Sequence, residues 1–164
     1  MSNVLLNKIS NKTAVLGVIG LGYVGLPLAV EKALSGYITK GFDVQKDKVD
    51  KINKGINYIG DIVDDDLKQI VSSGRLTAYD DIKGLMDADV LCICVPTPLN
   101  DHQEPVIDFV KETTENILSI LDKNQLIILE STTYPGTTEE LLKPILESTG
   151  FVVGKDIFLA FSPE

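Results

Sequence analysis

A glycine-rich turn near the start of the chain constrains the fold more than any other feature. In the segment "AVLGVIGLGYVGLPLA" (residues 14–29), Gly20, Gly22 and Gly25 follow an apolar strand-like run and precede apolar residues at helical spacing. With this G-x-G-x-x-G spacing, the first glycine permits the tight turn, the second lets the backbone approach a pyrophosphate, and the third lets helix and strand pack closely. The pattern predicts a dinucleotide site at a helix start, where unpaired N–H groups bind phosphate.

An acidic residue stands where such a unit needs one. Asp43 lies near the end of the second strand-like run, "YITKGFDV" (residues 37–44), about 20 residues after the glycines. Its carboxylate can accept hydrogen bonds from ribose hydroxyls and would repel a 2′-phosphate, so the sequence favours NAD over NADP as the cofactor. FAD, another adenosine-containing ligand and a glycine turn without any ligand are the alternatives.

Strand-like and helix-like segments alternate along the rest of the chain. Strands are expected at residues 14–20, 37–44, 88–96, 125–132 and 157–161, and helices at about 24–34, 47–55, 64–74, 107–121 and 137–150, with Pro144 kinking or splitting the last. This alternation is typical of a parallel sheet. The predicted fold class is α/β, a Rossmann-like doubly wound parallel sheet with helices on both faces.

The charge balance and hydropathy exclude some partners. The chain has 164 residues, and its 24 acidic residues outnumber the 15 Lys and Arg, which gives a formal net charge of −9. This excess argues against a nucleic-acid or anionic-membrane partner. No signal peptide and no membrane-spanning stretch is visible, so the cytoplasm is the expected location. We expect a leader at residues 1–12 and one NAD-binding domain at residues 13–164.

Three small groups of reactive side chains have ordinary structural interpretations. Cys92 and Cys94 would share one face of a strand and pack in the core, and no further metal ligands lie nearby. The aspartates at 64–66 are expected to cap a helix and to complement its dipole rather than to bind a metal. His102 is expected to be a solvated loop residue. The sequence therefore predicts no metal site.

Three further motifs make the predicted function more specific than a general dinucleotide site. "CVPTPL" (residues 94–99), "ESTTYPGTTEE" (residues 130–140) and "FSPE" (residues 161–164) each follow a predicted strand, at the sheet edge where open α/β sheets bind ligands. Together with "GLGYVGLPLA", and in this order, they resemble the UDP-glucose/GDP-mannose dehydrogenase family from about Thr13 onward. Glu-Ser-Thr and Ser-Pro-Glu, in place of Lys-Ser-Thr and Asn-Pro-Glu, are similar to the branch that acts on UDP-N-acetylhexosamines.

The resemblance implies a definite reaction. The C6 alcohol of a nucleotide sugar is oxidised to a carboxylate by two successive hydride transfers to two NAD molecules, the second through a thioester on a catalytic cysteine. The implied substrate is UDP-N-acetylglucosamine, with UDP-N-acetylmannosamine and UDP-glucose as alternatives. A homodimeric full-length enzyme and a role in polysaccharide biosynthesis are also implied.

The resemblance also assigns roles to residues. Thr132 is expected to hold a catalytic water near the nicotinamide, and Glu164 to act as an acid/base in thioester hydrolysis. Val24 matches a position contacting the pyrophosphate, Lys48 one near the adenosine ribose, and Thr97 a cofactor contact. Thr132 could instead cap the next helix, and Lys48 could be a solvated lysine. The expected cofactor-binding residues are Gly20, Gly22, Tyr23, Val24, Gly25, Asp43, Lys48, Pro96, Thr97, Ser131 and Thr132.

Parts of the family's active site have no counterpart in the sequence. The family's catalytic cysteine and lysine lie further along, in a central helix and a second domain that binds the nucleotide sugar. Cys92 and Cys94 lie within a predicted strand and cannot be that exposed nucleophile. We therefore expect the front part of a longer enzyme, inactive alone and unable to bind the sugar by itself. A stand-alone NAD-binding module without chemistry and a decayed remnant are the alternatives.

Overall fold

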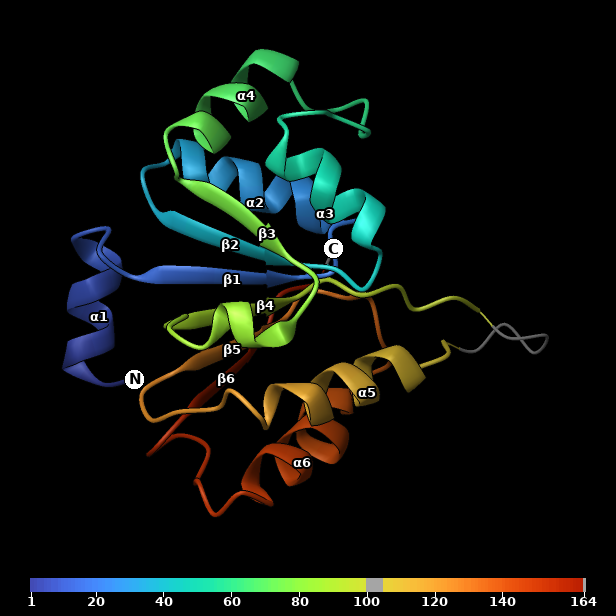
Figure 1. Cartoon of the computed structure of the whole chain (residues 1–164). Coiled ribbons are helices and arrows are strands. Elements are labelled where there is room, and N and C mark those ends of the chain that lie inside the picture. Colours follow the sequence, from blue (N-terminus) through green and yellow to red (C-terminus); the bar gives the residue numbers. More distant parts are fainter. Residues whose placement is uncertain (100–104, 164) are drawn as a thin grey trace.

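The computed structural model describes residues 1–99 and 105–163, and its centre is one parallel sheet. Within these residues the sheet has six strands in the order β3-β2-β1-β4-β5-β6 (Figure 1). The order reverses between β1 and β4, which is the switch point where doubly wound sheets bind ligands. The predicted Rossmann-like fold is therefore confirmed. The strands are β1 (Val15–Ile19), β2 (Ile38–Phe42), β3 (Leu76–Tyr79), β4 (Val90–Ile93), β5 (Leu126–Leu129) and β6 (Phe158–Phe161).

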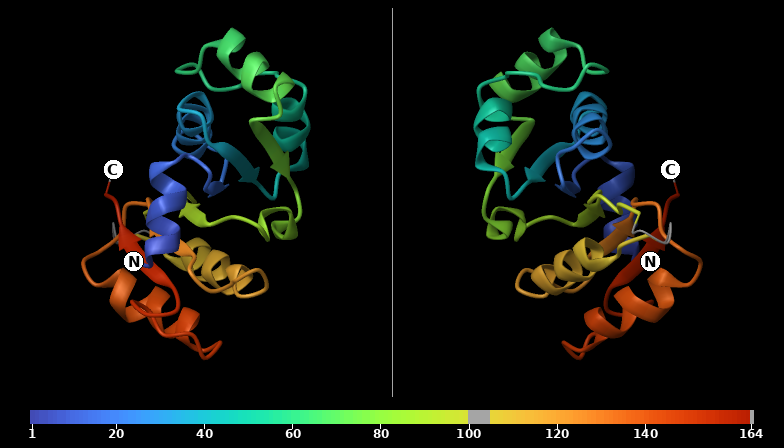
Figure 2. Two further views of the ribbon diagram at one scale, coloured as in Figure 1. Left: turned by 90° about the vertical axis from the view of Figure 1, so that its left-hand side faces the viewer. Right: turned by 90° about the vertical axis from the view of Figure 1, so that its right-hand side faces the viewer.

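Helices cover both faces of the sheet. Figures 1 and 2 show α2, α3 and α4 on one face and α5 and α6 on the other. No helix in the part of the chain that the structure describes is long and apolar enough to cross a bilayer. The helices are α1 (Asn3–Ser10), α2 (Gly25–Leu34), α3 (Lys46–Asn53), α4 (Asp64–Ser72), the 3₁₀ turn η1 (Ile82–Leu85), α5 (Asp108–Ile117), the π-helical turn η2 (Thr138–Leu142) and α6 (Lys143–Glu147).

The alternation of side chains along the strands produces two cores. In β4, Leu91 and Ile93 point into the cluster under α5 and α6, while Cys92 points into the cluster under α2 and α4. Cys94 lies in the same cluster as Cys92, as their spacing predicted. Because the central strands β1, β4 and β5 are buried between two helical layers, they read as nearly continuous apolar runs, whereas β2 and β3 nearer the edge alternate in burial.

The structure corrects several of the predicted elements. Strand β3 and helix α1 were not predicted from the sequence. The helix expected at 107–121 ends at Ile117, where the N–H groups of the next three residues bond to carbonyls three positions back and tighten the chain into a turn. The buried Gln125 then accepts a hydrogen bond from Asp122 N–H and donates one to the Ala88 carbonyl. The helix with Pro144 is split as expected, since η2 gives way to α6 beside this proline, which lacks an N–H.

The aspartates at 64–66 lie in the first turn of α4, but none of them is its cap. Val63 occupies the N-cap position and provides no side-chain hydrogen bond. Asp64 instead accepts a hydrogen bond from the amide of Asn57, at 3.0 Å. The expected cap is therefore wrong, whereas the favourable placement of acidic side chains at a helix start holds.

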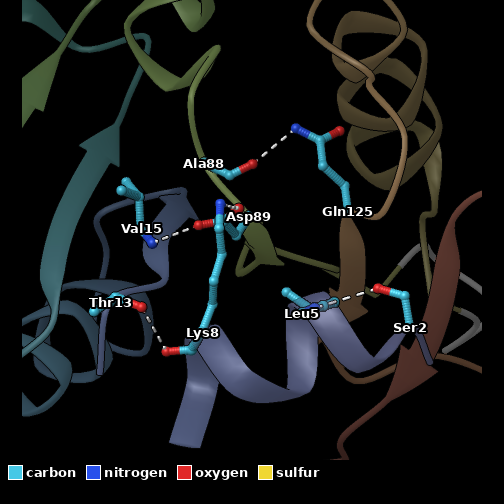
Figure 3. A network of polar contacts seen from close by, with 8 residues as sticks. All are labelled: Ser2, Leu5, Lys8, Thr13, Val15, Ala88, Asp89 and Gln125. Carbon is cyan, nitrogen blue, oxygen red and sulfur yellow. Dashed lines mark hydrogen bonds and ion pairs between the residues drawn. The ribbon is translucent and has the colours of Figure 1, made fainter. Parts of the chain in front are cut away.

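A polar network attaches α1 to the amino ends of the strands (Figure 3). Lys8 Nζ lies 2.6 Å from Asp89 Oδ1, and Asp89 Oδ2 accepts a hydrogen bond from Val15 N–H at 2.9 Å. Leu5, on the same helix, is buried in the core cluster under α2. Asp89 therefore joins α1 to the starts of β1 and β4, at the edge of the sheet opposite to the ligand-binding edge.

A buried hydroxyl in β2 provides a test of this packing. Thr39 is 1% exposed, and its Oγ1 has no hydrogen-bond partner in the described structure. We predict that Thr39→Val raises the free energy of unfolding by about 1 kcal/mol, because an unpaired buried hydroxyl is replaced by a methyl group of the same shape.

Thr114→Val is the matched control for denaturant unfolding. Thr114 is equally buried, but its hydroxyl donates to the Val110 carbonyl at 2.7 Å, so valine there should give no gain. A Thr39→Val protein that unfolds as readily as the parent would contradict the prediction.

Candidate functional site

A cleft opens at the carboxyl ends of β1, β2, β4 and β5. Its volume is about 430 Å³. It brings together all of the predicted cofactor-binding residues except Gly25, from the loops after β1, β2, β4 and β5 and from helix α3. The lining residues are Gly20, Gly22, Tyr23, Val24, Asp43, Lys48, Cys94, Val95, Pro96, Thr97, Ser131 and Thr132.

The three glycines of the turn are required for different reasons. Gly20 has a φ of +92°, and a Cβ there would lie 2.6 Å from the Cys94 carbonyl oxygen. A Cβ on Gly25 would overlap the Gly20 carbonyl oxygen. A Cβ on Gly22 would meet no atom within 4 Å. The protein itself therefore requires Gly20 and Gly25, while the open space at Gly22 fits the close approach of a ligand.

The start of α2 faces this open space without a side-chain cap. Val24 is the N-cap residue and makes no side-chain hydrogen bond, and the first turn contains no acidic residue. The N–H groups at a helix start carry partial positive charge and bind phosphate oxygens well. The turn and the helix together therefore form a cradle suited to a pyrophosphate. Gly25 contributes by letting α2 begin close to β1.

Asp43 is buried beneath the cleft and holds two loops together. Its Oδ2 accepts a hydrogen bond from Leu21 N–H and its Oδ1 one from Gln45 N–H, each at 2.9 Å. Lys48 Nζ lies 3.5 Å from Oδ2. Oδ2 accepts from both Leu21 and Lys48, whereas within the described residues Oδ1 accepts from Gln45 alone, so Oδ1 can accept a further hydrogen bond from a ribose hydroxyl. The Lys48 side chain is 27% exposed and lines the cleft beside Asp43.

Two hydroxyl groups join the loops after β4 and β5. Ser131 Oγ donates to the Val95 carbonyl and Thr97 Oγ1 donates to the Thr132 carbonyl, both at 2.7 Å. The side chain of Thr132 is exposed at the cleft. Thr132 does not cap the following helix, because the N-cap residue of η2 is Thr137. The two bonds fix the side of the cleft that is opposite to Asp43.

A second cavity of about 340 Å³ adjoins the first and was not predicted from the sequence. It shares Asp43 and Lys48 with the first and lies between the loop after β2 and helix α5. Val44 and Phe109 are 81% and 46% exposed on its lining, and such apolar surface suits the flat face of an adenine ring. The available sequence signal was Val44, an apolar residue directly after Asp43, the acid that follows β2. Its other new lining residues are Ile19, Phe42, Gln45, Ile82, Glu112, Thr113 and Asn116.

Glu130 does not line the cleft beside its neighbour Ser131. It lines a separate apolar hollow of about 170 Å³ together with Lys32 and Cys92. Burial, with the nearby charge of Glu130, raises the pKa of the Cys92 thiol to about 12. A thiol with this pKa is almost entirely protonated at neutral pH, so Cys92 is no nucleophile.

Two predicted residues cannot be placed. Glu164 and His102 lie outside the residues that the structure describes. Ser162, two residues before Glu164, donates its N–H to the Leu129 carbonyl at 3.0 Å, so the chain leaves β6 beside the end of β5. In the described ranges, no group of three or more His, Cys, Asp or Glu side chains gathers that could hold a metal ion.

Comparison with known proteins gives consistent matches. The profile of the "UDP-glucose/GDP-mannose dehydrogenase family, NAD binding domain" matches residues 14–164. The UDP-N-acetyl-D-mannosamine dehydrogenase of Pyrococcus horikoshii is 36% identical over 150 residues, which are 91% of this chain and 36% of that protein. The UDP-N-acetyl-D-glucosamine 6-dehydrogenase of Pseudomonas aeruginosa is 34% identical over 150 residues, which are 91% of this chain and 35% of that protein.

Solved structures agree. A ternary complex of GDP-mannose dehydrogenase from Pseudomonas aeruginosa superposes with a TM-score of 0.86 at 28% identity, covering 91% of this chain and 36% of that chain. The UDP-N-acetyl-mannosamine dehydrogenase Cap5O from Staphylococcus aureus gives a TM-score of 0.86 at 35% identity, covering 92% and 37%. The chain thus spans about a third of the length of the curated relatives it matches.

The geometry of Gly22 makes a prediction about cofactor binding. We predict that Gly22→Ala weakens NAD binding about tenfold or more, because the added methyl group occupies the space that a pyrophosphate needs. Its stability should equal that of the parent, since the methyl group meets no protein atom. Titration calorimetry and thermal unfolding measure the two quantities.

Gly60→Ala is the matched control for this substitution. A Cβ there also meets no atom within 4 Å, but Gly60 lies outside the cleft. Its NAD affinity should be unchanged. Equal NAD affinity in Gly22→Ala and the parent would contradict the role of the cradle.

Proposed function

The chain belongs to the UDP-glucose/GDP-mannose dehydrogenase family, and we propose that it serves an enzyme that oxidises the C6 alcohol of UDP-N-acetylglucosamine to a carboxylate. The family assignment makes it an NAD-binding domain. The observation that carries the proposal is the cleft itself, in which the phosphate cradle, Asp43 and Thr132 line one space. NAD, when bound, supplies the acceptor for hydride from the sugar, and two molecules would be reduced for each uronate formed.

The residues of the chain have separate tasks in this proposal. The start of α2 and Gly22 bind the pyrophosphate, and Val24 borders it. Asp43 accepts hydrogen bonds from the hydroxyls of the adenosine ribose, beside Lys48. The second cavity receives the adenine ring. These contacts fix one end of the cofactor, so the other end extends toward the loops after β4 and β5.

The loops after β4, β5 and β6 then form the reaction side of the cleft. Ser131 and Thr97 hold the first two loops together, and Pro96 shapes the wall. Thr132, exposed at the cleft, orients a water molecule near the nicotinamide. Glu164, outside the described residues, acts as the acid/base toward that water in thioester hydrolysis. Tyr23, 81% exposed beside Gly22, covers the bound cofactor.

The proposed choice of sugar rests on the residues that occupy two motifs. Glu-Ser-Thr at 130–132 and Ser-Pro-Glu at 162–164 favour an N-acetylhexosamine over glucose. UDP-N-acetylmannosamine is the second candidate, because a relative with that activity in its name is 36% identical to this chain. UDP-glucose is the third.

Several properties belong to the proposed whole enzyme. Since the relatives are about three times as long, the catalytic cysteine and lysine and the sugar-binding domain would come from further chain. We infer a domain at residues 13–164, against which the leader at 1–12 packs through the buried Leu5 of α1. We also infer a homodimeric enzyme in the cytoplasm and a uronate product used in polysaccharide biosynthesis. A non-catalytic NAD-binding module is the competing function.

The reaction gives a direct test of turnover. The 164-residue chain should form no NADH from NAD and UDP-N-acetylglucosamine, because positioning is worth roughly 7–11 kcal/mol and the sugar is not held. A chain extended to the length of its relatives should form two NADH for each sugar, preferring UDP-N-acetylglucosamine over UDP-N-acetylmannosamine and UDP-glucose. NADH absorbance measures both.

Glu164→Ala in the extended chain is the accompanying variant and should abolish turnover while leaving NAD affinity intact. Turnover by the short chain would contradict the need for further chain. An extended chain that binds NAD but oxidises none of the three sugars would favour the binding module.

The charge of Asp43 predicts the choice of cofactor. The chain should bind NAD more tightly than NADP. Asp43→Asn should reduce the ratio of the two affinities by a factor on the order of ten, which corresponds to about 1.4 kcal/mol. The asparagine nitrogen would face one of two N–H donors, so stability should fall. The ratio of the two affinities, measured by calorimetry on the same variant, separates the two effects.

Asp47→Asn is the control for the loss of one negative charge. Asp47 is 79% exposed on α3 and pairs with Lys51, outside both cavities. Its NAD and NADP affinities should keep the parent's ratio. Equal binding of NAD and NADP by the parent would remove the role of Asp43.

A further inference from the structure

Both backbone groups of Leu21 are held by side chains from elsewhere in the chain. Leu21 is the fully buried residue between Gly20 and Gly22. Its N–H donates to Asp43 Oδ2 at 2.9 Å, and its carbonyl accepts a hydrogen bond from Tyr58 Oη at 2.7 Å. The first bond belongs to the site described above. The second comes from a residue outside both cavities, and the proposed function gives it no task.

The loop that carries Tyr58 is itself fixed. Tyr58 lies between α3 and α4, where the side chain of Asn57 donates to the Ile62 carbonyl and accepts from Ile59 N–H, each at 2.8 Å. Ile59 and Ile62 are buried in the core cluster under α2, and Tyr58 packs against the same cluster. Its hydroxyl therefore reaches Leu21 from a rigid position.

The phenol is also kept in its donor form. Burial, assisted by the negative charge of Asp43, raises the pKa of Tyr58 above its ordinary value. The hydroxyl thus stays protonated at neutral and mildly alkaline pH, and the bond to the Leu21 carbonyl persists there.

The orientation of one peptide plane connects this bond to the cofactor. The Leu21 carbonyl and the Gly22 N–H belong to the same planar trans peptide, so they point in opposite directions. With glycine on both sides of Leu21, this part of the backbone has unusual rotational freedom. Holding the carbonyl from the Tyr58 side directs the Gly22 N–H away from Tyr58. Gly22 lines the cleft, whereas Tyr58 does not.

We propose that Tyr58 is a positioning residue for the cofactor, whose hydroxyl fixes the Leu21–Gly22 peptide so that the Gly22 N–H meets the pyrophosphate. The proposal rests on the NAD site and adds to it a residue from the α3–α4 loop. Tyr58 acts through Gly22 and touches no part of the cofactor. The loop between α3 and α4 is thereby coupled to phosphate binding, although it lines neither cavity.

Tyr58→Phe removes only the hydroxyl, and Tyr37→Phe is its matched control. Tyr37 Oη also donates to a backbone carbonyl, that of Ile9, at 2.9 Å, but far from the cleft. Both variants lose one such bond, so both should be slightly less stable. Only Tyr58→Phe should weaken NAD binding, by about 3- to 10-fold.

The amide NMR signal of Gly22 provides a second readout, which a merely structural role would not move. In the parent and in Tyr37→Phe, saturating NAD should shift this signal strongly. In Tyr58→Phe the shift should shrink, because the N–H no longer points steadily at the pyrophosphate. Asn57→Ala, which keeps the hydroxyl but loosens its loop, should give a smaller loss of NAD affinity than Tyr58→Phe.

Two results would overturn the proposal. One is a Tyr58→Phe protein that binds NAD as tightly as Tyr37→Phe. The other is a loss of NAD affinity in Tyr58→Phe with the Gly22 shift unchanged, since Tyr58 would then act by another route. Failure of the parent chain to bind NAD is a different result, because it would overturn the cofactor site itself.

Discussion

The buried carboxylate of Asp43 is the interaction on which the rest of the ligand-binding edge depends. It is 6% exposed, and burying such a charge is costly unless hydrogen bonds replace the lost water. Two backbone N–H groups do so, and they come from the loops after β1 and β2. The glycine turn is therefore held by the same group that is proposed to select the ribose. The Asp43 side chain therefore supports the backbone of both loops and is also proposed to recognise the cofactor.

Much of the fold and part of the site could be predicted from the sequence, because local backbone chemistry determines them. The G-x-G-x-x-G spacing and the long apolar runs identify β1, α2 and β4 without any knowledge of their neighbours. The loops after β4 and β5 were placed correctly, since all strands of a parallel sheet end at the same edge. The family resemblance then added Thr97 and Ser131, whose hydroxyls the structure shows holding these loops together.

The features that sequence reasoning missed depend on contacts between distant segments. Strand β3 (Leu-Thr-Ala-Tyr) lacks the continuous apolar run that marks the equally short β4 and β5. The turn that follows α5 is held by Gln125, which bonds to a carbonyl 37 positions away. The second cavity is bordered by the exposed Val44 and Phe109, which carry no periodic signal. The bond of Tyr58 also spans 37 positions. Sequence patterns predict helices and strands well. Hydrogen bonds between residues that are distant in the sequence form only when these elements pack together.

Glu130 and Ser131 are neighbours in the sequence but line different cavities. Ser131 lines the cofactor cleft, while Glu130 borders the apolar hollow beside Lys32 and Cys92. A substitution of Glu130 would therefore change the charge at the hollow directly, while Ser131 could keep its hydrogen bond to the Val95 carbonyl. Two adjacent letters of one short motif thus belong to two different surfaces of the domain.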